Sequence, residues 1–105
     1  MPGVLNCHPT EAKDWVDDGT AILIDVREDQ ELIQARIPEA IHLPLSRFDP
    51  HGLPEADGKR IAFLCAHGVR SQQVGHYLVS NGLLEEAYSV TGGIVAWAQA
   101  GLPYE

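Results

Sequence analysis

A strand, a tight loop and the start of a helix follow one another in Ile61-Ala62-Phe63-Leu64-Cys65-Ala66-His67-Gly68-Val69-Arg70-Ser71. The first four residues form a continuous apolar run, which is typical of a strand that is covered on both faces. Gly68 allows the chain to turn sharply before a helix that we expect to begin near Ser71. Because sites in open α/β sheets lie at the carboxyl ends of strands, Cys65 is the first candidate for a functional residue.

The rest of the chain repeats this alternation of strand and helix. Further short apolar runs at residues 21–24, 40–43 and 87–90, with a shorter one at 4–5, predict about five strands in all. Apolar residues at helical spacing lie between the runs, in the triplets Ala12/Trp15/Val16, Val74/Tyr77/Leu78 and Ile94/Trp97/Ala98. One more helix is expected over residues 28–36, stopped by Pro38, and residues 44–59 form the one long irregular connection. We predict a single α/β domain over residues 1–105, with about five parallel strands flanked by helices on both faces.

Composition excludes several classes of partner. The chain has 105 residues, with fifteen acidic and seven basic side chains and a net charge of -8. This charge repels nucleic acid backbones and anionic lipid surfaces, so neither is an expected partner. The longest apolar run is far shorter than the roughly 20 residues of a membrane-spanning helix. The amino terminus lacks the basic start and apolar stretch of a secretory signal, so we expect a cytoplasmic protein.

The two cysteines, Cys7 and Cys65, are too few for a disulfide scaffold, and neither lies in a metal-binding spacing. In the cytoplasm these thiols would be reduced, and we expect no metal site. Cys7 could act as a resolving thiol for an oxidised Cys65. Its place near the amino terminus favours a half-buried residue without a chemical role.

The loop after residue 64 favours a thiolate at Cys65. Backbone N–H groups of a tight loop and the positive end of the following helix both stabilise a negative charge at the loop centre. Such surroundings lower a cysteine pKa from its usual value of about 8.5, which makes the sulfur a nucleophile without a dedicated base. Arg70 can hold an anionic substrate in a two-pronged grip.

The spacing between the cysteine and the arginine separates two chemistries. A Cys-x5-Arg loop cradles a tetrahedral phosphate or arsenate, whereas residues 65–70 form a Cys-x4-Arg loop. The narrower ring of amides has room for one added sulfur atom, so sulfur transfer fits better than phosphoryl transfer. A phosphatase or an arsenate reductase remains an alternative, as does a sulfur-relay or binding module that does not turn over.

Several motifs together resemble the rhodanese family of sulfurtransferases. Besides the loop 65–70, Leu23-Ile24-Asp25-Val26-Arg27 is similar to the family's Asp-Val-Arg strand, and Ile37-Pro38 followed by Ala40-Ile41-His42-Leu43-Pro44 resembles its second signature. Gly92-Gly93, Trp97, Gly101 and Pro103 resemble its closing motif. The resemblance extends from about Leu23 to Pro103, with the motifs in family order.

The resemblance implies a single rhodanese-like domain and a two-step reaction of the thiosulfate sulfurtransferase type. Cys65 would take a sulfane sulfur from thiosulfate, a thiosulfonate or a persulfide and become a persulfide. Cyanide, a thiol or a sulfur-accepting protein would then remove it, which is covalent catalysis in two steps. The reaction that the resemblance implies needs no metal or organic cofactor. Expected partners are thus a small-molecule sulfur donor and acceptor, with a thiol protein such as thioredoxin as a further candidate.

The candidate substrate-binding residues are those of the loop, namely Ala66, His67, Gly68, Val69 and Arg70. His67 could donate a hydrogen bond to a substrate or point into water. Four residues are expected to support the site: Ser71 at the helix start, Asp25 and Arg27 as a structural ion pair, and Arg36 as a cation at the site mouth or on the surface. The second loop position, often basic in family members that use thiosulfate, is Ala66, which counts against thiosulfate as the natural donor.

Overall fold

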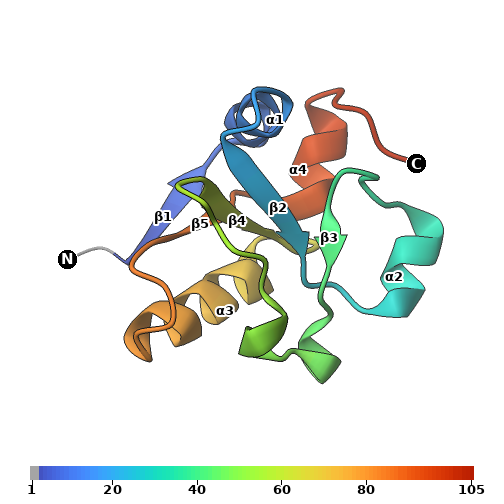
Figure 1. Ribbon diagram of the computed structural model, residues 1–105. Coiled ribbons are helices and arrows are strands. Elements are labelled where there is room, and N and C mark those ends of the chain that lie inside the picture. Colours follow the sequence, from blue (N-terminus) through green and yellow to red (C-terminus); the bar gives the residue numbers. More distant parts are fainter. Residues whose placement is uncertain (1–2) are drawn as a thin grey trace.

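The computed structural model describes residues 3–105, which form one parallel sheet with helices packed around it (Figure 1). The elements follow the order β1 (Val4–Cys7), α1 (Pro9–Asp17), β2 (Ala21–Asp25), α2 (Asp29–Gln34), β3 (Ile41–His42), β4 (Arg60–Leu64), α3 (Val69–Ser80), β5 (Ala87–Val90) and α4 (Gly93–Gln99). The strands lie in the order β1-β5-β4-β2-β3, and every pair is parallel. The predicted five-stranded parallel α/β fold is confirmed.

The central position of β4 follows from its sequence. Its residues after Arg60 are all buried, and Phe63 and Leu64 are completely excluded from solvent. Phe63 lies beside Ile24 of β2 on one side and Ser89 of β5 on the other. Because the sheet is parallel, the carboxyl ends of the strands lie along one edge, and Cys65 follows the strand at its middle.

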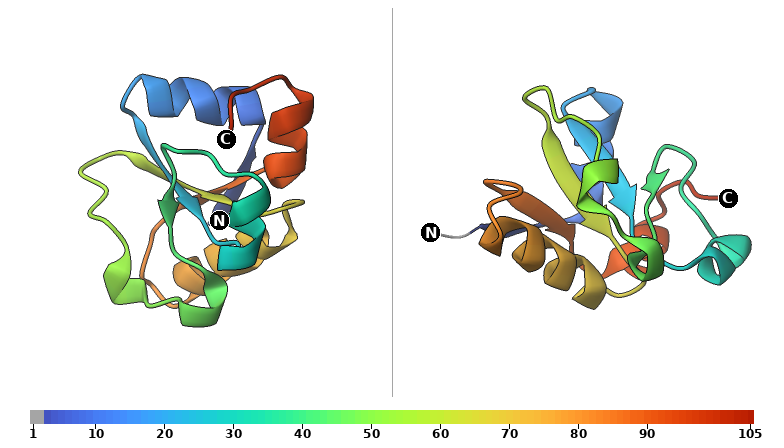
Figure 2. Two further views of the ribbon diagram at one scale, coloured as in Figure 1. Left: turned by 90° about the vertical axis from the view of Figure 1, so that its right-hand side faces the viewer. Right: turned by 60° about the horizontal axis from the view of Figure 1, so that its bottom comes forward.

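The core has two layers, one on each face of the sheet. Helices α1 and α4 cover one face, where Ala12 and Trp97 pack against Leu23 and Leu64. Helix α3 covers the other face, where Val74 and Leu78 pack against Phe63. Figure 2 shows α1 and α4 together on the side of the sheet opposite α3.

Helix α2 lies outside both layers, beyond the edge strand β3, and has no buried residue (Figure 1). It is shorter than the predicted helix 28–36 because Ala35 already has an extended backbone, with φ -163° and ψ 139°. The predicted strand 40–43 is also shorter, since only Ile41 and His42 pair with β2.

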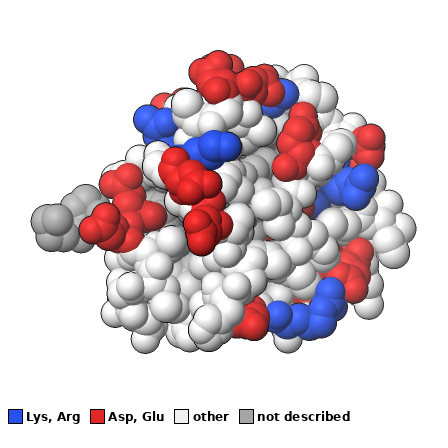
Figure 3. All heavy atoms as spheres, in the orientation of Figure 1, with Lys and Arg blue, Asp and Glu red and all other residues white. Residues whose placement is uncertain are grey.

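The long connection between β3 and β4 contains two short 3-10 turns, Leu45–Arg47 and Pro50–Gly52, so it is less irregular than predicted. Acidic side chains outnumber basic ones on the face in Figure 3, in keeping with the net charge of -8. Among residues 3–105, none of the helices has the length and hydrophobicity needed to cross a bilayer.

Candidate active site

The candidate nucleophile lies between β4 and α3, as the sequence predicts. Gly68 is the N-cap of α3 and has a φ of 99°, a left-handed conformation that side chains other than glycine rarely adopt. This turn lets the chain reverse direction over three residues after Cys65. Helix α3 begins at Val69, two residues before the predicted start near Ser71, so Ser71 lies in its first turn.

The sulfur of Cys65 accepts hydrogen bonds from backbone amides at the start of α3. The amide nitrogen of Gly68 lies 3.0 Å from Sγ and that of Ser71 lies 3.4 Å away, while the Ser71 hydroxyl oxygen lies at 3.5 Å. Burial alone would raise the pKa of the Cys65 thiol. The bonds from the Ser71 hydroxyl and from the Ser71, Gly68 and His67 amides outweigh that effect, so the pKa lies below its usual value.

A second hydroxyl extends this hydrogen-bond network into the sheet. Ser71 Oγ lies 2.6 Å from Ser89 Oγ, and both residues are buried. When Cys65 is a thiolate, the Ser71 hydroxyl can donate to sulfur and accept from Ser89. Sequence reasoning did not single out Ser89, although a serine within the apolar run of β5 is an available signal, since a buried hydroxyl needs a partner.

Helix α4 is joined to the loop by two backbone hydrogen bonds. The Ile94 amide donates to the Cys65 carbonyl at 2.9 Å, and the Val95 amide donates to the Ala66 carbonyl at 3.2 Å. Gly93 allows this approach, because a Cβ built on it would lie 2.3 Å from the Cys65 carbonyl oxygen. Its φ of 61° adds a second reason for glycine at this position.

Arg70 forms an ion pair with Glu31 of α2, so its guanidinium already has an anionic partner within the protein. Its Nη1 and Nη2 lie 2.8 Å and 2.7 Å from the two carboxylate oxygens. The side-chain hydrogen bonds from Arg70 lower the pKa of Glu31 to about 2. The same hydrogen bonds to Glu31 are the main reason that the pKa of Arg70 is raised, and the charge of Cys65 adds to this effect. Sequence reasoning missed Glu31, which is 39 residues from its partner.

Asp25 and Arg27 form the buried ion pair that the sequence predicts as a brace. Arg27 Nη2 lies 2.8 Å from Asp25 Oδ2, and both side chains are 3% exposed or less. The same guanidinium donates to the carbonyl oxygen of Glu31 within α2 and to that of Ala35 just after the helix. The pair therefore ties α2 to the carboxyl end of β2.

The other predicted residues occupy less direct positions. Ala66 is half-buried, whereas His67 and Val69 are exposed, and it is the backbone amide of His67 that contributes to the lowered pKa of Cys65. Arg36 is exposed and pairs with Glu105 at 3.4 Å, so it lies in a surface contact.

Cys7 is fully buried, at 1% exposure, which corrects the expectation of a half-buried residue. Its pKa is raised to about 12, first by burial and then by the charge of Glu11. It packs in the core layer on the α1 side of the sheet, whereas Cys65 packs on the α3 side. This separation by the sheet argues against a resolving role for Cys7.

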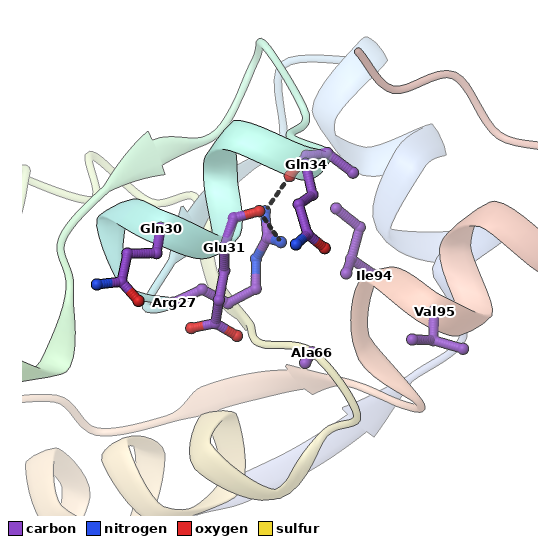
Figure 4. Close-up of a pocket in the computed structure, with 8 residues that line it drawn as sticks. Arg27, Gln30, Glu31, Gln34, Ala66, Ile94 and Val95 are labelled. Atoms are coloured by element: carbon purple, nitrogen blue, oxygen red, sulfur yellow. Dashed lines mark hydrogen bonds between the residues drawn. The ribbon is translucent and has the colours of Figure 1, made fainter.

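A pocket of about 360 Å³ lies between α2 and the loop, and we call it the α2 pocket (Figure 4). One wall carries the polar side chains of Gln30, Glu31 and Gln34. The opposite wall is apolar and consists of Ala66, Ile94 and Val95. Within residues 3–105, no group of three or more histidine, cysteine, aspartate or glutamate side chains is placed to hold a metal ion.

The chain is thus an α/β domain with a parallel sheet and a cysteine at the carboxyl end of its middle strand, where backbone amides donate hydrogen bonds to the sulfur. The sequence matches the rhodanese-like domain family over residues 8–100. The chain belongs to this rhodanese-like family.

Two relatives illustrate the range of similarity. The chain is 32% identical over 105 residues to the thiosulfate sulfurtransferase GlpE of Vibrio cholerae, covering all of this chain and 98% of that protein. It is 44% identical over 82 residues to the uncharacterized protein slr1261 of Synechocystis, covering 78% of this chain but only 45% of that protein. Among solved structures, a rhodanese-related protein from Thermoplasma volcanium superposes with a TM-score of 0.78 at 28% identity, covering 96% of this chain and 97% of that one.

Proposed function

We propose that this protein is a sulfurtransferase that carries a sulfane sulfur as a persulfide on Cys65. The observation that carries this proposal is the position of the Cys65 sulfur, which accepts hydrogen bonds from the Gly68 and Ser71 amides. The sulfurtransferase names of relatives similar over nearly the whole chain support the same activity. Candidate donors are thiosulfate, a thiosulfonate or a persulfide, and candidate acceptors are cyanide, a thiol or a sulfur-accepting protein.

In the first step, the Cys65 thiolate attacks the sulfane sulfur of the donor. A new bond forms between Sγ and that sulfur, and the donor's own bond to it breaks, with the electron pair leaving on the donor remainder. In the second step, the acceptor attacks the outer sulfur and Cys65 leaves as a thiolate. The loop amides stabilise the negative sulfur at the beginning and at the end of the cycle, so no metal is needed for either step.

The direct test is intact-mass measurement after incubation with each donor class. We expect a gain of one sulfur atom in the native protein and in Cys7→Ser, and none in Cys65→Ser. Cys7→Ser is the matched control because the chain has two cysteines and Cys7 lies in the other core layer. Absence of the added sulfur with every donor would contradict the proposal.

Two further measurements separate the alternatives. Repeated turnover of thiosulfate and cyanide to thiocyanate distinguishes an enzyme from a relay module that loads sulfur once. Hydrolysis of an aryl phosphate that Cys65→Ser abolishes would identify a phosphatase instead.

A further inference from the structure

Two buried hydroxyl groups lead from the Cys65 sulfur into the sheet. Ser71 Oγ lies 3.5 Å from Cys65 Sγ, and Ser89 Oγ lies 2.6 Å from Ser71 Oγ. All three residues are at most 1% exposed. We call these three groups the hydroxyl network. Its outer member, Ser89, does not touch the sulfur and belongs to a different strand.

The register of the sheet places Ser89 on the same face as Cys65. Ser89 of β5 is the neighbour of Phe63 in β4, and Phe63 and Cys65 both pack on the α3 side. Neighbouring residues in register share a face of a sheet, as do residues two apart in one strand. Ser71 lies in the first turn of α3, so its side chain bridges Cys65 and Ser89.

The number of hydrogens in the hydroxyl network matches the thiolate form of Cys65. The network has two contacts, one between the sulfur and Ser71 Oγ and one between the two oxygens. In the thiolate form, the two hydroxyl hydrogens fill both contacts, with Ser89 donating to Ser71 and Ser71 donating to the sulfur. A thiol adds a third hydrogen, and among residues 3–105 these groups have no third contact. Because an unpaired buried hydrogen-bonding group is costly, the network favours the thiolate.

Ser89 decides which way the Ser71 hydroxyl points. Either oxygen of the Ser71–Ser89 pair can be the donor, so the single Ser71 hydrogen could go to Ser89 instead of the sulfur. When Ser89 donates to Ser71, that hydrogen is left for Cys65. Burial raises the pKa of Cys65, and hydrogen bonds lower it, first among them the bond with the Ser71 hydroxyl. The direction of this hydroxyl therefore affects the charge on the sulfur.

The charged groups at this edge of the sheet are separate from the hydroxyl network. They form two internal ion pairs, Arg70–Glu31 and Arg27–Asp25. The side chain of His67 is exposed. A substitution at Ser89 alters none of these charges, so a change in Cys65 reactivity after that substitution reports on the hydroxyl network.

We propose that Ser89 is a positioning residue, whose hydroxyl donates to Ser71 and so directs the Ser71 hydrogen to the Cys65 sulfur whenever that sulfur is anionic. This inference rests on the proposed sulfurtransferase function. The sulfur is anionic as the attacking thiolate. It becomes anionic again when the acceptor takes the outer sulfur, because the electron pair of the breaking sulfur–sulfur bond moves onto Sγ. Ser89 thus assists both the loading and the release of sulfur.

The first test is the pH profile of Cys65 alkylation by iodoacetamide in Ser89→Ala. We expect the midpoint to rise by about 0.5 pH unit, so that alkylation below the midpoint is about threefold slower. Well above the midpoint the two rates should converge to within about twofold, since the thiolate is then fully formed in both proteins.

Cys7→Ala is the matched control. Cys7 Sγ lies 3.7 Å from the Ser89 carbonyl oxygen and packs in the other core layer. This variant therefore removes a contact of the same residue without touching its hydroxyl. The Cys65 midpoint should stay within about 0.2 pH unit of the native value.

A double variant tests whether Ser89 acts through Ser71. In a Ser71→Ala background, Ser89→Ala should cause no further shift of the Cys65 midpoint, because the group that connects Ser89 to the sulfur is already absent. A general structural role of Ser89 would instead shift the midpoint in both backgrounds.

Release of sulfur is measured separately, by rapid mixing of the persulfide-loaded protein with cyanide. Ser89→Ala should slow this single step about twofold, because a less stabilised thiolate is a poorer leaving group. The difference should persist at pH values where the alkylation rates converge.

The outcomes separate this inference from the proposed function. An unchanged midpoint in Ser89→Ala, an equal shift in Cys7→Ala, a full shift in the Ser71→Ala background, or equal rates of sulfur release overturns the inference while Cys65 still loads sulfur. Failure of native Cys65 to gain sulfur from any donor overturns the proposed function itself.

Discussion

Gly93→Ala should destabilise the protein through a contact that no other described glycine makes with the reactive loop. The added Cβ would lie 2.3 Å from the Cys65 carbonyl oxygen and 2.5 Å from the Ala66 carbonyl oxygen. Both neighbours are backbone atoms, so the start of α4 and the loop must separate. This separation weakens the two hydrogen bonds that the Ile94 and Val95 amides donate to the loop carbonyls.

The expected magnitude has two parts. Placing alanine at a φ of 61° costs about 1 kcal/mol. Losing two backbone hydrogen bonds costs about 1 kcal/mol each. We therefore expect the free energy of unfolding to fall by about 3 kcal/mol, which leaves a domain of ordinary stability folded.

Gly101→Ala is the matched control for this prediction. Gly101 has a φ of 77°, but a Cβ there would meet no atom within 4 Å, so only the cost of about 1 kcal/mol remains. Urea denaturation followed by tryptophan fluorescence measures both variants. The midpoint pH of Cys65 alkylation should also rise in Gly93→Ala, because the displaced loop binds the thiolate less well. Equal destabilisation of the two variants, within about 0.5 kcal/mol, would refute the reasoning.

Three other predictions follow from single contacts. Ser71→Ala should raise the pKa of Cys65 and slow its alkylation by iodoacetamide at pH 7 roughly threefold to tenfold, because the thiolate loses a hydroxyl donor; an unchanged pH profile would contradict this role. Asp25→Ala should lower the free energy of unfolding by about 3 to 5 kcal/mol, since it leaves the Arg27 charge buried and unpaired; denaturation at neutral pH tests this. The pKa of Cys7 is about 9 in the unfolded chain and about 12 in the folded protein. The unfolded chain therefore loses this proton first, so the free energy of unfolding should fall as the pH rises above 9. Cys7→Ala should reduce that fall.

The strands and the position of Cys65 were predictable because their signals are local. Short, mainly apolar runs at residues 21–24, 61–64 and 87–90 correspond to β2, β4 and β5, and Cys65 directly follows the most buried of the three. The run at 40–43 gave only a two-residue strand. There the Ala40 amide bonds to Ile37 in a turn, and β3 pairs only with β2.

The partners of the site were not predictable in the same way. Glu31 lies on a short helix with no buried face, so no apolar periodicity marks it, and its contact with Arg70 depends on how α2 is placed in three dimensions. The pairing of Ser71 with Ser89 likewise depends on which strand lies beside β4, and the positions of the apolar runs do not predict the order of the strands in the sheet.

Helix α2 supplies one wall of the α2 pocket but contributes no buried side chain to either core layer. Its outward residues can therefore be exchanged without disturbing the packing that folds the domain. The lining of the pocket and the folding of the domain are separable properties in such an arrangement, and a library confined to Gln30 and Gln34 would vary the first while leaving the capping box and the ion pair of Glu31 intact.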